Sequence, residues 1–303
     1  MNTVYVNSPN ESWVVDRQVN EWYEHNTDMS VTDVNKAHVV WLYADWCWTR
    51  IPRSILLSKK VLTTVHHIVP EKFGQPQLTE FRLRDAITMA YHVPNVHTRD
   101  FIAPLTTKPI HVICYWGNQL IFKRTSDKET LRKKHVFPQN AYIIGSAQRD
   151  TEGAGISSEI YLPKLEKGPD ILADFIIAKH KETNNVHAVL AGWRRQYMIS
   201  RLHSAGVPFS YLEMLSHNVL NEIYQTLDLY PVTSRYEGGP QSLIEAGLVG
   251  VPVVSRDMGI ASAVLPQAAI NDDVSKATPT IPNVDDLKLP RGFAKYRSLI
   301  QSL

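Results

Sequence analysis

The sequence lacks several features that would place it in a specialised class. Its 303 residues include only two cysteines, Cys47 and Cys114, too few for a disulfide framework or a cysteine-rich metal site, which favours a reducing compartment. No run approaches the ~18 apolar residues of a membrane span, and the N-terminus has neither the charged nor the apolar region of a signal peptide. We therefore expect a cytoplasmic protein without a transmembrane segment.

An excess of charge of one sign is also missing. The chain has 32 Lys and Arg against 30 Asp and Glu, a formal net charge of +2. Its densest basic segment, residues 128–135, is explained more simply as a solvated helix face. Since phosphate backbones are bound by basic stripes, we expect no nucleic-acid partner.

Four common catalytic motifs do not occur. The sequence contains no Asp-x-Asp, no H-E-x-x-H, no Walker lysine loop and no complete G-x-G-x-x-G. These absences argue against a metal-bridged diphosphate site, a zinc protease, a P-loop enzyme and a standard dinucleotide dehydrogenase. We expect no metal site and no resident cofactor.

The length and the hydrophobic pattern favour two α/β lobes. The chain is about twice the ~150-residue prior for one domain, and short apolar runs alternate with helical stretches, as in parallel sheets covered by helices. We assign residues 1–137 to a first lobe, residues 138–288 to a second, and residues 289–303 to a C-terminal amphipathic helix that packs back on the first lobe.

The expected elements are clearer in the second lobe. In the first lobe we expect strands at 4–6, 38–43 and 61–65 and helices at 13–24, 81–89 and near 128. In the second we expect strands at 141–144, 186–191, 209–212, 229–233 and 251–255, and helices at 171–181, 194–205, 219–226 and 242–249. Such β-α units build a doubly wound sheet whose ligands bind at the carboxyl ends of the strands.

The most informative segment is Ser234–Ala246, with the sequence SRYEGGPQSLIEA. It leaves a strand, crosses a Gly-Gly turn and enters a helix whose expected first residue is Pro240. Backbone N–H groups and the positive end of the helix dipole would bind an anion there. Gly238 and Gly239 would let a phosphate approach closely because they have no Cβ atom.

Two glutamates, Glu237 on the loop and Glu245 in the helix, frame this turn. Their spacing and the flanking residues resemble the E-x7-E donor-site motif of retaining glycosyltransferases of the GT-B fold, particularly family 4 (group 1). The resemblance implies two Rossmann-like lobes with a cleft between them and a C-terminal helix crossing back. It also implies that Glu237 binds hydroxyl groups of the transferred sugar and Glu245 the ribose of the donor.

A second match lies upstream. Residues 144–149 and 166–172 resemble the opening strand and the Lys-Gly helix start of the same family. The resemblance implies that Arg149 and Lys167 bind the donor diphosphate, where fixed cations stabilise the departing negative charge. The intervening stretch is longer than in the family, so Lys164 remains an alternative to Lys167.

Two further strand ends resemble the nucleotide site of the family. Gly192 stands where the family places a glycine near the nucleotide, and Leu212 where backbone groups hold the base. Arg194 or Arg195 either adds a phosphate contact or belongs to a solvated helix start.

The first lobe resembles the family less closely. Residues 62–70 are similar to the strand whose terminal histidine faces the donor sugar, which implies a catalytic role for His66, or else His67; the alternative is a hydrogen-bonded loop histidine. The glycine-rich loop common near the N-terminus of the family is replaced by residues 7–12. Trp46 and Trp48 either line the cleft or belong to the core.

Together these features predict a hexosyltransferase-like glycosyltransferase. It would move a sugar from a nucleoside diphosphate sugar to an unidentified glycan, lipid or small-molecule acceptor, with retention and without metal. Two alternatives stay open: a sugar-nucleotide epimerase of similar fold, and a nucleotide-sugar-binding protein that lacks transfer activity.

Overall fold

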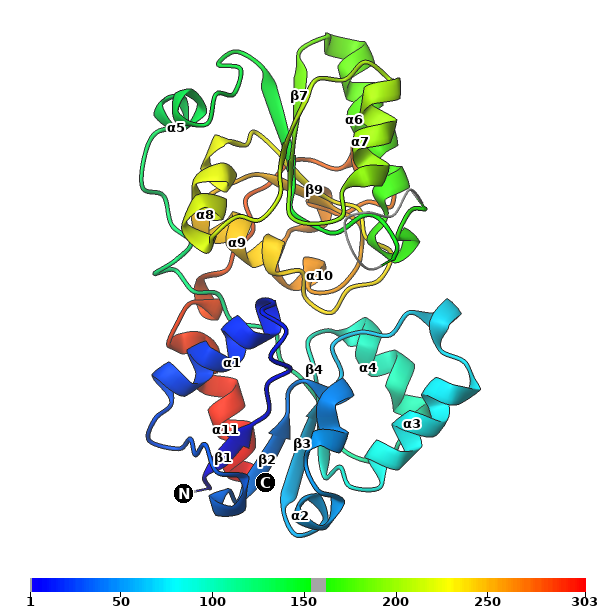
Figure 1. The fold of residues 1–303 in the computed structure, drawn as a ribbon, viewed down its shortest axis with the longest axis vertical. Coiled ribbons are helices and arrows are strands. Elements are labelled where there is room, and N and C mark those ends of the chain that lie inside the picture. The colour runs from blue at the N-terminus through cyan, green and yellow to red at the C-terminus, as the bar shows by residue number, and fades with distance from the viewer. Residues whose placement is uncertain (1, 154–161) are drawn as a thin grey trace. The chain divides into compact units, whose positions relative to one another are not determined.

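The computed structural model describes residues 2–153 and 162–303 and divides the chain into two compact units (Figure 1). Unit 1 comprises residues 1–116 and 289–303, and unit 2 comprises residues 117–288. The boundary thus lies earlier than the expected one after residue 137. The reason is that Arg132, on the helix at 128–134, donates hydrogen bonds to the Thr226 carbonyl (2.9 Å) and the Asp228 carboxylate (2.6 Å), both in unit 2.

Unit 1 contains a parallel five-stranded sheet in the order β1-β2-β3-β4-β5. Its strands are β1 (Val4–Val6), β2 (Val39–Leu42), β3 (Lys60–Thr64), β4 (Ala90–Val93) and β5 (Ile110–Val112). Its α-helices are α1 (Val14–His25), α2 (Arg53–Leu57), α3 (Gln75–Asp85), α4 (Val96–Ile102) and α11 (Ala294–Ser302). The expected helix at 81–89 is wrong in its placement: α3 ends at Asp85, and the following apolar residues enter the fully buried strand β4.

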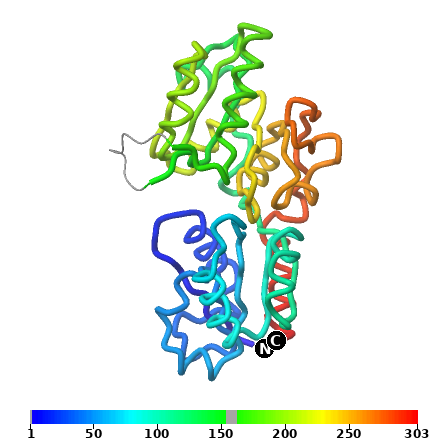
Figure 2. Tube along the Cα trace, turned by 90° about the vertical axis from the view of Figure 1, so that its right-hand side faces the viewer, coloured from blue at the N-terminus to red at the C-terminus, as the bar shows by residue number. Residues whose placement is uncertain are grey.

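Side chains of β2 alternate between two helical layers, as a strand period of two requires. The Trp41 ring lies 5.1 Å from that of Trp22 on α1 and 5.3 Å from that of Tyr296 on α11. Val40 and Leu42 pack instead with side chains of α2 on the opposite face. The chain ends also meet in unit 1 (Figure 2), where the Asn2 amide donates to Gln301 Oε1 at 2.8 Å.

Unit 2 has a three-stranded parallel sheet and a two-stranded parallel sheet. The strands are β6 (Tyr142–Ser146), β7 (Val186–Ala191), β8 (Phe209–Leu212), β9 (Tyr230–Val232) and β10 (Val253–Ser255). The α-helices are α5 (Lys128–Lys134), α6 (Pro169–Thr183), α7 (Gln196–Ser204), α8 (His217–Thr226), α9 (Gln241–Val249) and α10 (Ala261–Val264). A parallel bridge between Ile144 and Leu229 connects β6 to β9. The expected turn at Gly145–Ser146 is the end of β6.

The larger sheet of unit 2 is covered on both faces (Figure 1). Ile144 packs with Leu172 of α6 and Met198 of α7. The next residue along β6, Gly145, faces α8, and a Cβ there would lie 2.7 Å from a methyl carbon of Leu227. This arrangement confirms the expected α/β class with a doubly wound second lobe.

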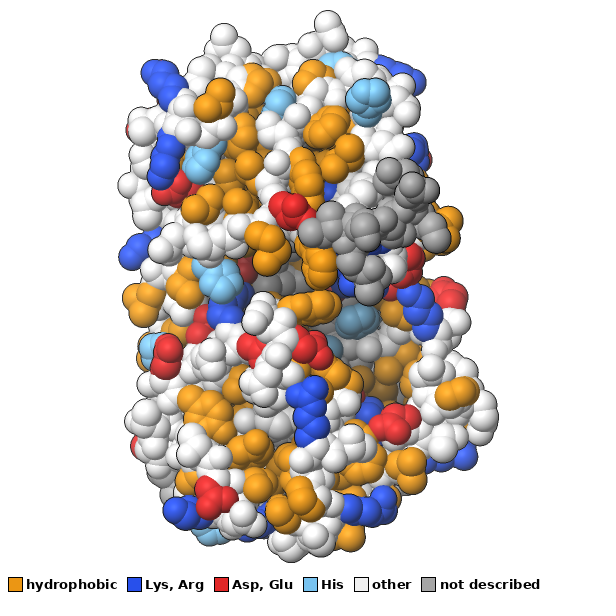
Figure 3. Space-filling view, viewed as in Figure 1, with side chains coloured by type: hydrophobic (Ala, Val, Ile, Leu, Met, Phe, Trp, Pro, Cys, Tyr) orange, Lys and Arg blue, Asp and Glu red, His pale blue; other side chains and the backbone are white. Residues whose placement is uncertain are grey.

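The surface agrees with the near-neutral charge. On the face drawn in Figure 3, Lys and Arg side chains are interspersed with Asp and Glu side chains. Within the described residues, no helix has both the length and the apolar character that crossing a membrane demands.

Candidate functional site

Three loops meet at the carboxyl edge of the sheets in unit 2. The N–H groups of Arg235 and Tyr236, which follow β9, donate to the Glu166 carbonyl at 2.8 and 3.1 Å. Gln148, which follows β6, donates from its side chain to the Lys167 carbonyl at 2.8 Å. The loops after β6 and β9 are therefore both bound to the segment that opens α6.

A hydrogen bond to Gly168 fixes the start of α6. Gly168 is in the left-handed region with φ of +60°, and its carbonyl accepts a hydrogen bond from the Thr233 hydroxyl at 2.9 Å. Arg235 also donates to both carboxylate oxygens of Asp170, at 2.8 and 2.7 Å. The hydrogen bonds from Arg235 hold the pKa of Asp170 below its ordinary value. The position of Lys167 is thus determined by its neighbours on both sides.

Lys167 and Glu237 form an ion pair at this junction. Lys167 Nζ lies 2.6 Å from Glu237 Oε1, and the two side chains are 18% and 13% exposed. The Ser234 hydroxyl is 3.2 Å from the same oxygen. Lys164, the alternative in the sequence, pairs instead with Glu166 at 3.0 Å. The structure therefore places Lys167, and not Lys164, beside Glu237.

Arg149 lies on the loop after β6. Its guanidinium donates to the carbonyl of Thr151 at 3.3 Å and to that of Gly153. Residues 154–161, which follow this loop, are outside the described residues. A diphosphate contact of Arg149 remains a prediction.

The two arginines after β7 are fully buried, so of the two alternatives the solvated helix start is wrong. Arg195 donates to the Asp150 carboxylate and to the carbonyls of Ser146 (2.7 Å) and Ala191 (2.6 Å). Arg194 donates to the Glu152 carbonyl. These guanidinium groups connect the ends of β6 and β7.

Gly192 and Leu212 lie side by side at the ends of β7 and β8. Gly192 is left-handed, with φ of +88°, and its N–H donates to the Leu212 carbonyl at 2.9 Å. A Cβ at position 192 would lie 3.6 Å from the Ala147 carbonyl oxygen. Contacts of Gly192 and Leu212 with a nucleotide remain predictions.

The Gly-Gly turn leads into α9, whose first residue is Gln241 rather than the expected Pro240. Pro240 is the N-cap residue, and within the described part of the chain its side chain makes no capping hydrogen bond. Gly259 packs under the turn with φ of +56°, and a Cβ there would lie 2.9 Å from Pro240 Cδ and 3.0 Å from the Gly238 carbonyl oxygen. Close packing therefore fixes Gly238, Gly239 and Pro240 at the positive end of the α9 dipole.

Glu245 lies one turn inside α9 and is 6% exposed. The Tyr224 hydroxyl donates to its Oε2 at 3.0 Å. Burial, with the nearby Tyr230 and Glu245, raises the pKa of Tyr224 well above its ordinary value, so the phenol stays a donor. No local sequence pattern indicates this partner, because Tyr224 belongs to α8 and Glu245 to α9.

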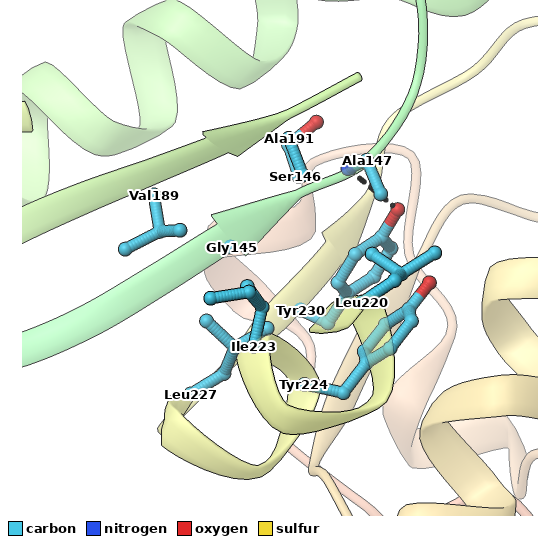
Figure 4. A pocket seen from close by; sticks show the side chains of 10 residues that line it. All are labelled: Gly145, Ser146, Ala147, Val189, Ala191, Leu220, Ile223, Tyr224, Leu227 and Tyr230. Atoms are coloured by element: carbon cyan, nitrogen blue, oxygen red, sulfur yellow. Dashed lines mark hydrogen bonds between the residues drawn. The ribbon is translucent and has the colours of Figure 1, made fainter. Parts of the chain in front are cut away.

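A small pocket of about 180 Å³ lies beside these tyrosines (Figure 4). It is lined by Gly145, Ser146, Ala147, Val189, Ala191, Leu220, Ile223, Tyr224, Leu227 and Tyr230. The Ala147 N–H donates to the Tyr230 hydroxyl at 3.0 Å across one side of it. That volume includes open solvent, and the enclosed part is about the size of one water molecule, so this pocket is too small for a nucleotide.

In unit 1, His66 has partners on both ring nitrogens. Its Nε2 donates to the Tyr43 carbonyl at 2.7 Å, and its Nδ1 contacts the Tyr115 hydroxyl. Burial lowers the pKa of His66, which favours the neutral ring. The geometry is that of the hydrogen-bonded loop histidine, and a role toward the donor sugar remains a prediction.

The tryptophans of the following segment separate into two environments. Trp48 is 6% exposed and packs in the core cluster of Val40 and Leu56, whereas Trp46 is 47% exposed. The core interpretation is therefore correct for Trp48. Among residues 2–153 and 162–303, no three His, Cys, Asp or Glu side chains gather as metal ligands would.

Comparison with known proteins places this site in a family. The sequence model of "Glycosyl transferases group 1" matches residues 160–277, which include Lys167, Glu237 and Glu245. No curated protein sequence matches the chain significantly.

Solved structures share the fold at low sequence identity. HepE of Anabaena, solved with UDP and glucose, is 15% identical with a TM-score of 0.67, covering 88% of this chain and 84% of its own. Sucrose-phosphate synthase of Thermosynechococcus elongatus is 16% identical with a TM-score of 0.60, over 77% and 60% of the two chains. The pneumococcal O-GlcNAc transferase GtfA, solved with UDP and GlcNAc, is 16% identical with a TM-score of 0.52, over 76% and 44%.

The family match and the fold agree with each other and with the expectation from the sequence. The matched residues lie within unit 2, and the structural likeness extends over both units. Residues 160–277 match the group 1 glycosyltransferase family, and the chain has the GT-B fold of these solved structures.

Proposed function

We propose that the protein transfers a sugar from a nucleoside diphosphate sugar to a hydroxyl group of an acceptor, with retention and without a divalent metal. The observation that carries this proposal is the 2.6 Å pair between Lys167 Nζ and Glu237 Oε1, at the N-terminal end of α9. A cation, a helix N-terminus and a carboxylate in one place suit a donor whose phosphates are anionic and whose sugar presents hydroxyl groups.

Lys167 can bind Glu237 and the donor phosphates at the same time. An ammonium group has three N–H donors, so one can stay on Glu237 while the others bind phosphate oxygens. The same pairing aligns Glu237 to accept hydrogen bonds from hydroxyl groups of the sugar. In this proposal Arg149 adds a second cation, and Glu245 binds the ribose.

The chemical step needs little from the protein beyond the positive charge of Lys167 and of the α9 N-terminus. The bond between the anomeric carbon and the phosphate oxygen breaks, and the acceptor oxygen bonds to the same face of that carbon. The acceptor proton moves to the departing phosphate. Lys167 and the α9 dipole would stabilise the diphosphate charge that builds up as the bond breaks.

The titles of two similar structures name the first donors to test. HepE was solved with UDP and glucose, and GtfA with UDP and GlcNAc. We therefore expect UDP to bind more tightly than GDP or ADP when each is titrated into the purified chain by calorimetry. A chain that binds none of the three nucleotides would refute the proposal.

The two alternatives are distinguished by product analysis. Incubation with UDP-glucose or UDP-GlcNAc alone, followed by NMR, would reveal an epimer if the protein were an epimerase. Nucleotide binding without transfer to any acceptor, and without hydrolysis of the donor, would instead identify a binding protein.

A further inference from the structure

The carboxyl edge of the sheet in unit 1 is built from interlocked loops. Asn7, after β1, donates to the Ala44 carbonyl (2.8 Å) and accepts from the Ala44 N–H (2.9 Å) after β2. His66, after β3, joins Tyr43 to Tyr115. Ligands of parallel sheets bind at this edge. The carboxyl edge of unit 1 is therefore a second place, besides that of unit 2, where a ligand can bind.

The loop after β1 is organised around one carboxylate. Asp16 accepts hydrogen bonds from the Ser8 hydroxyl and from the N–H groups of Asn10 (2.9 Å), Glu11 (2.8 Å) and Trp13 (3.3 Å). These four donors on one side chain restrain the loop.

This loop also contains unfavourable backbone conformations. Asn10 and Ser12 are left-handed, with φ of 55° and 58°. Such a conformation is unfavourable and persists where its surroundings impose it, often at functional sites. Arg50 adds a further restraint through a 2.7 Å hydrogen bond to the Pro9 carbonyl.

The loop presents Glu11 to an exposed indole. The Trp46 Nε1–H donates to Glu11 Oε1 at 3.3 Å, and the indole ring lies 5.7 Å from the His66 ring. Although these contacts restrain it, Trp46 is 47% exposed. A tryptophan that is held in place with nearly half of its surface exposed is a platform on which a ligand can stack.

The chemistry of this platform matches a neutral sugar. The face of an indole carries partial negative charge and attracts the weakly positive C–H groups of a pyranose ring. The Glu11 carboxylate accepts hydrogen bonds from hydroxyl groups and repels anionic groups such as phosphate. Stacking and hydroxyl recognition thus lie side by side.

We propose that Trp46 and Glu11 bind a neutral sugar residue of the acceptor, which makes the acceptor a carbohydrate. The assignment of this sugar as the acceptor rests on the proposed function. Sugar binding at Trp46 does not, since it requires neither a donor nor the residues of unit 2.

The test is saturation-transfer NMR on the full chain with maltose, cellobiose, lactose and chitobiose, without any nucleotide. We expect at least one disaccharide to bind. Trp46→Ala should weaken its affinity about tenfold, the upper range of an aromatic contact, and Trp46→Tyr should restore much of it. Leu57→Ala, which removes an exposed apolar side chain before β3, should change nothing.

Two results would overturn the proposal: no signal from any of the four disaccharides on the wild type, or a wild-type affinity in a folded Trp46→Ala variant. Calorimetry with UDP on the same preparation keeps the two hypotheses apart. Disaccharide binding without UDP binding would refute the proposed function and support the sugar site. UDP binding without disaccharide binding would refute the sugar site and support the proposed function.

Discussion

A Cβ atom added to Gly168 would lie 2.7 Å from the carbonyl carbon of Thr233. Gly168 also has φ of +60°, a conformation that residues with a side chain rarely adopt. Only glycine satisfies both conditions. This backbone contact sets the start of α6 against the end of β9, so the meeting of Lys167 with Glu237 depends on a glycine that touches neither charged group.

We predict that Gly168→Ala destabilises unit 2 by about 3 kcal/mol or more, because it adds both left-handed strain and steric overlap. Gly206→Ala is the matched control: Gly206 has φ of +70°, but no atom of residues 2–153 and 162–303 outside its chain neighbours lies within 4 Å of its added Cβ. It should cost only about 1–2 kcal/mol. Urea unfolding followed by circular dichroism measures both, and equal losses would show that the Thr233 contact is not tight.

Lys167 and Lys164 have different carboxylate partners, so we predict that their substitution by alanine affects nucleotide affinity differently. Lys167→Ala removes the cation beside Glu237 and should weaken UDP binding about 10- to 100-fold, the value of one or two charge-assisted hydrogen bonds. Lys164→Ala is the control, because Lys164 is paired with Glu166 and not with Glu237. Calorimetry that found Lys164→Ala the more damaging change would reverse the assignment.

Much of the fold of unit 2 could be predicted because its strands are continuous apolar runs that end at glycine or polar residues. The bounds of β7 and β8 match the sequence prediction, and β9 differs by one residue at each end. In unit 1, β4 escaped prediction because its Ala-Tyr-His-Val sequence directly follows a helical pattern and shows no alternation. Its His92 is buried by partners that a sequence does not reveal.

The candidate site was predictable as a motif but not as a set of contacts. The positions of Glu237, Glu245 and Lys167 follow from a local pattern. The role of Arg195 does not, because a charged residue at a helix start is usually solvated. Its partner Asp150 is 45 residues away, and only the folded chain brings the two together.

The buried pair of Arg195 and Asp150 gives a prediction about stability. Both side chains are fully buried, and removing one partner leaves an uncompensated charge. Asp150→Asn should therefore destabilise unit 2 by about 3–5 kcal/mol. Glu129→Gln, which breaks an exposed pair with Lys133, should have no measurable effect in the same urea titration. Similar midpoints for the two variants would contradict the prediction.

His92 makes the stability of unit 1 depend on pH. The ring is fully buried between Thr64 (2.9 Å from Nδ1) and the Ile113 carbonyl (2.9 Å from Nε2), and burial lowers its pKa from 6.5 to about 3. Between these values the unfolded chain binds a proton that the native state does not, so stability is present above pH 6.5 and is lost as the pH falls toward 3. The loss should be about 1.4 kcal/mol per pH unit.

Tryptophan fluorescence during urea unfolding reports mainly on unit 1, because Trp193 is the only tryptophan in residues 117–288. A His92→Gln variant should be less stable than the wild type at pH 7.5, but its free energy of unfolding should fall less steeply with pH, by about 1.4 kcal/mol per pH unit. An unchanged pH dependence would show that His92 is not the titrating group.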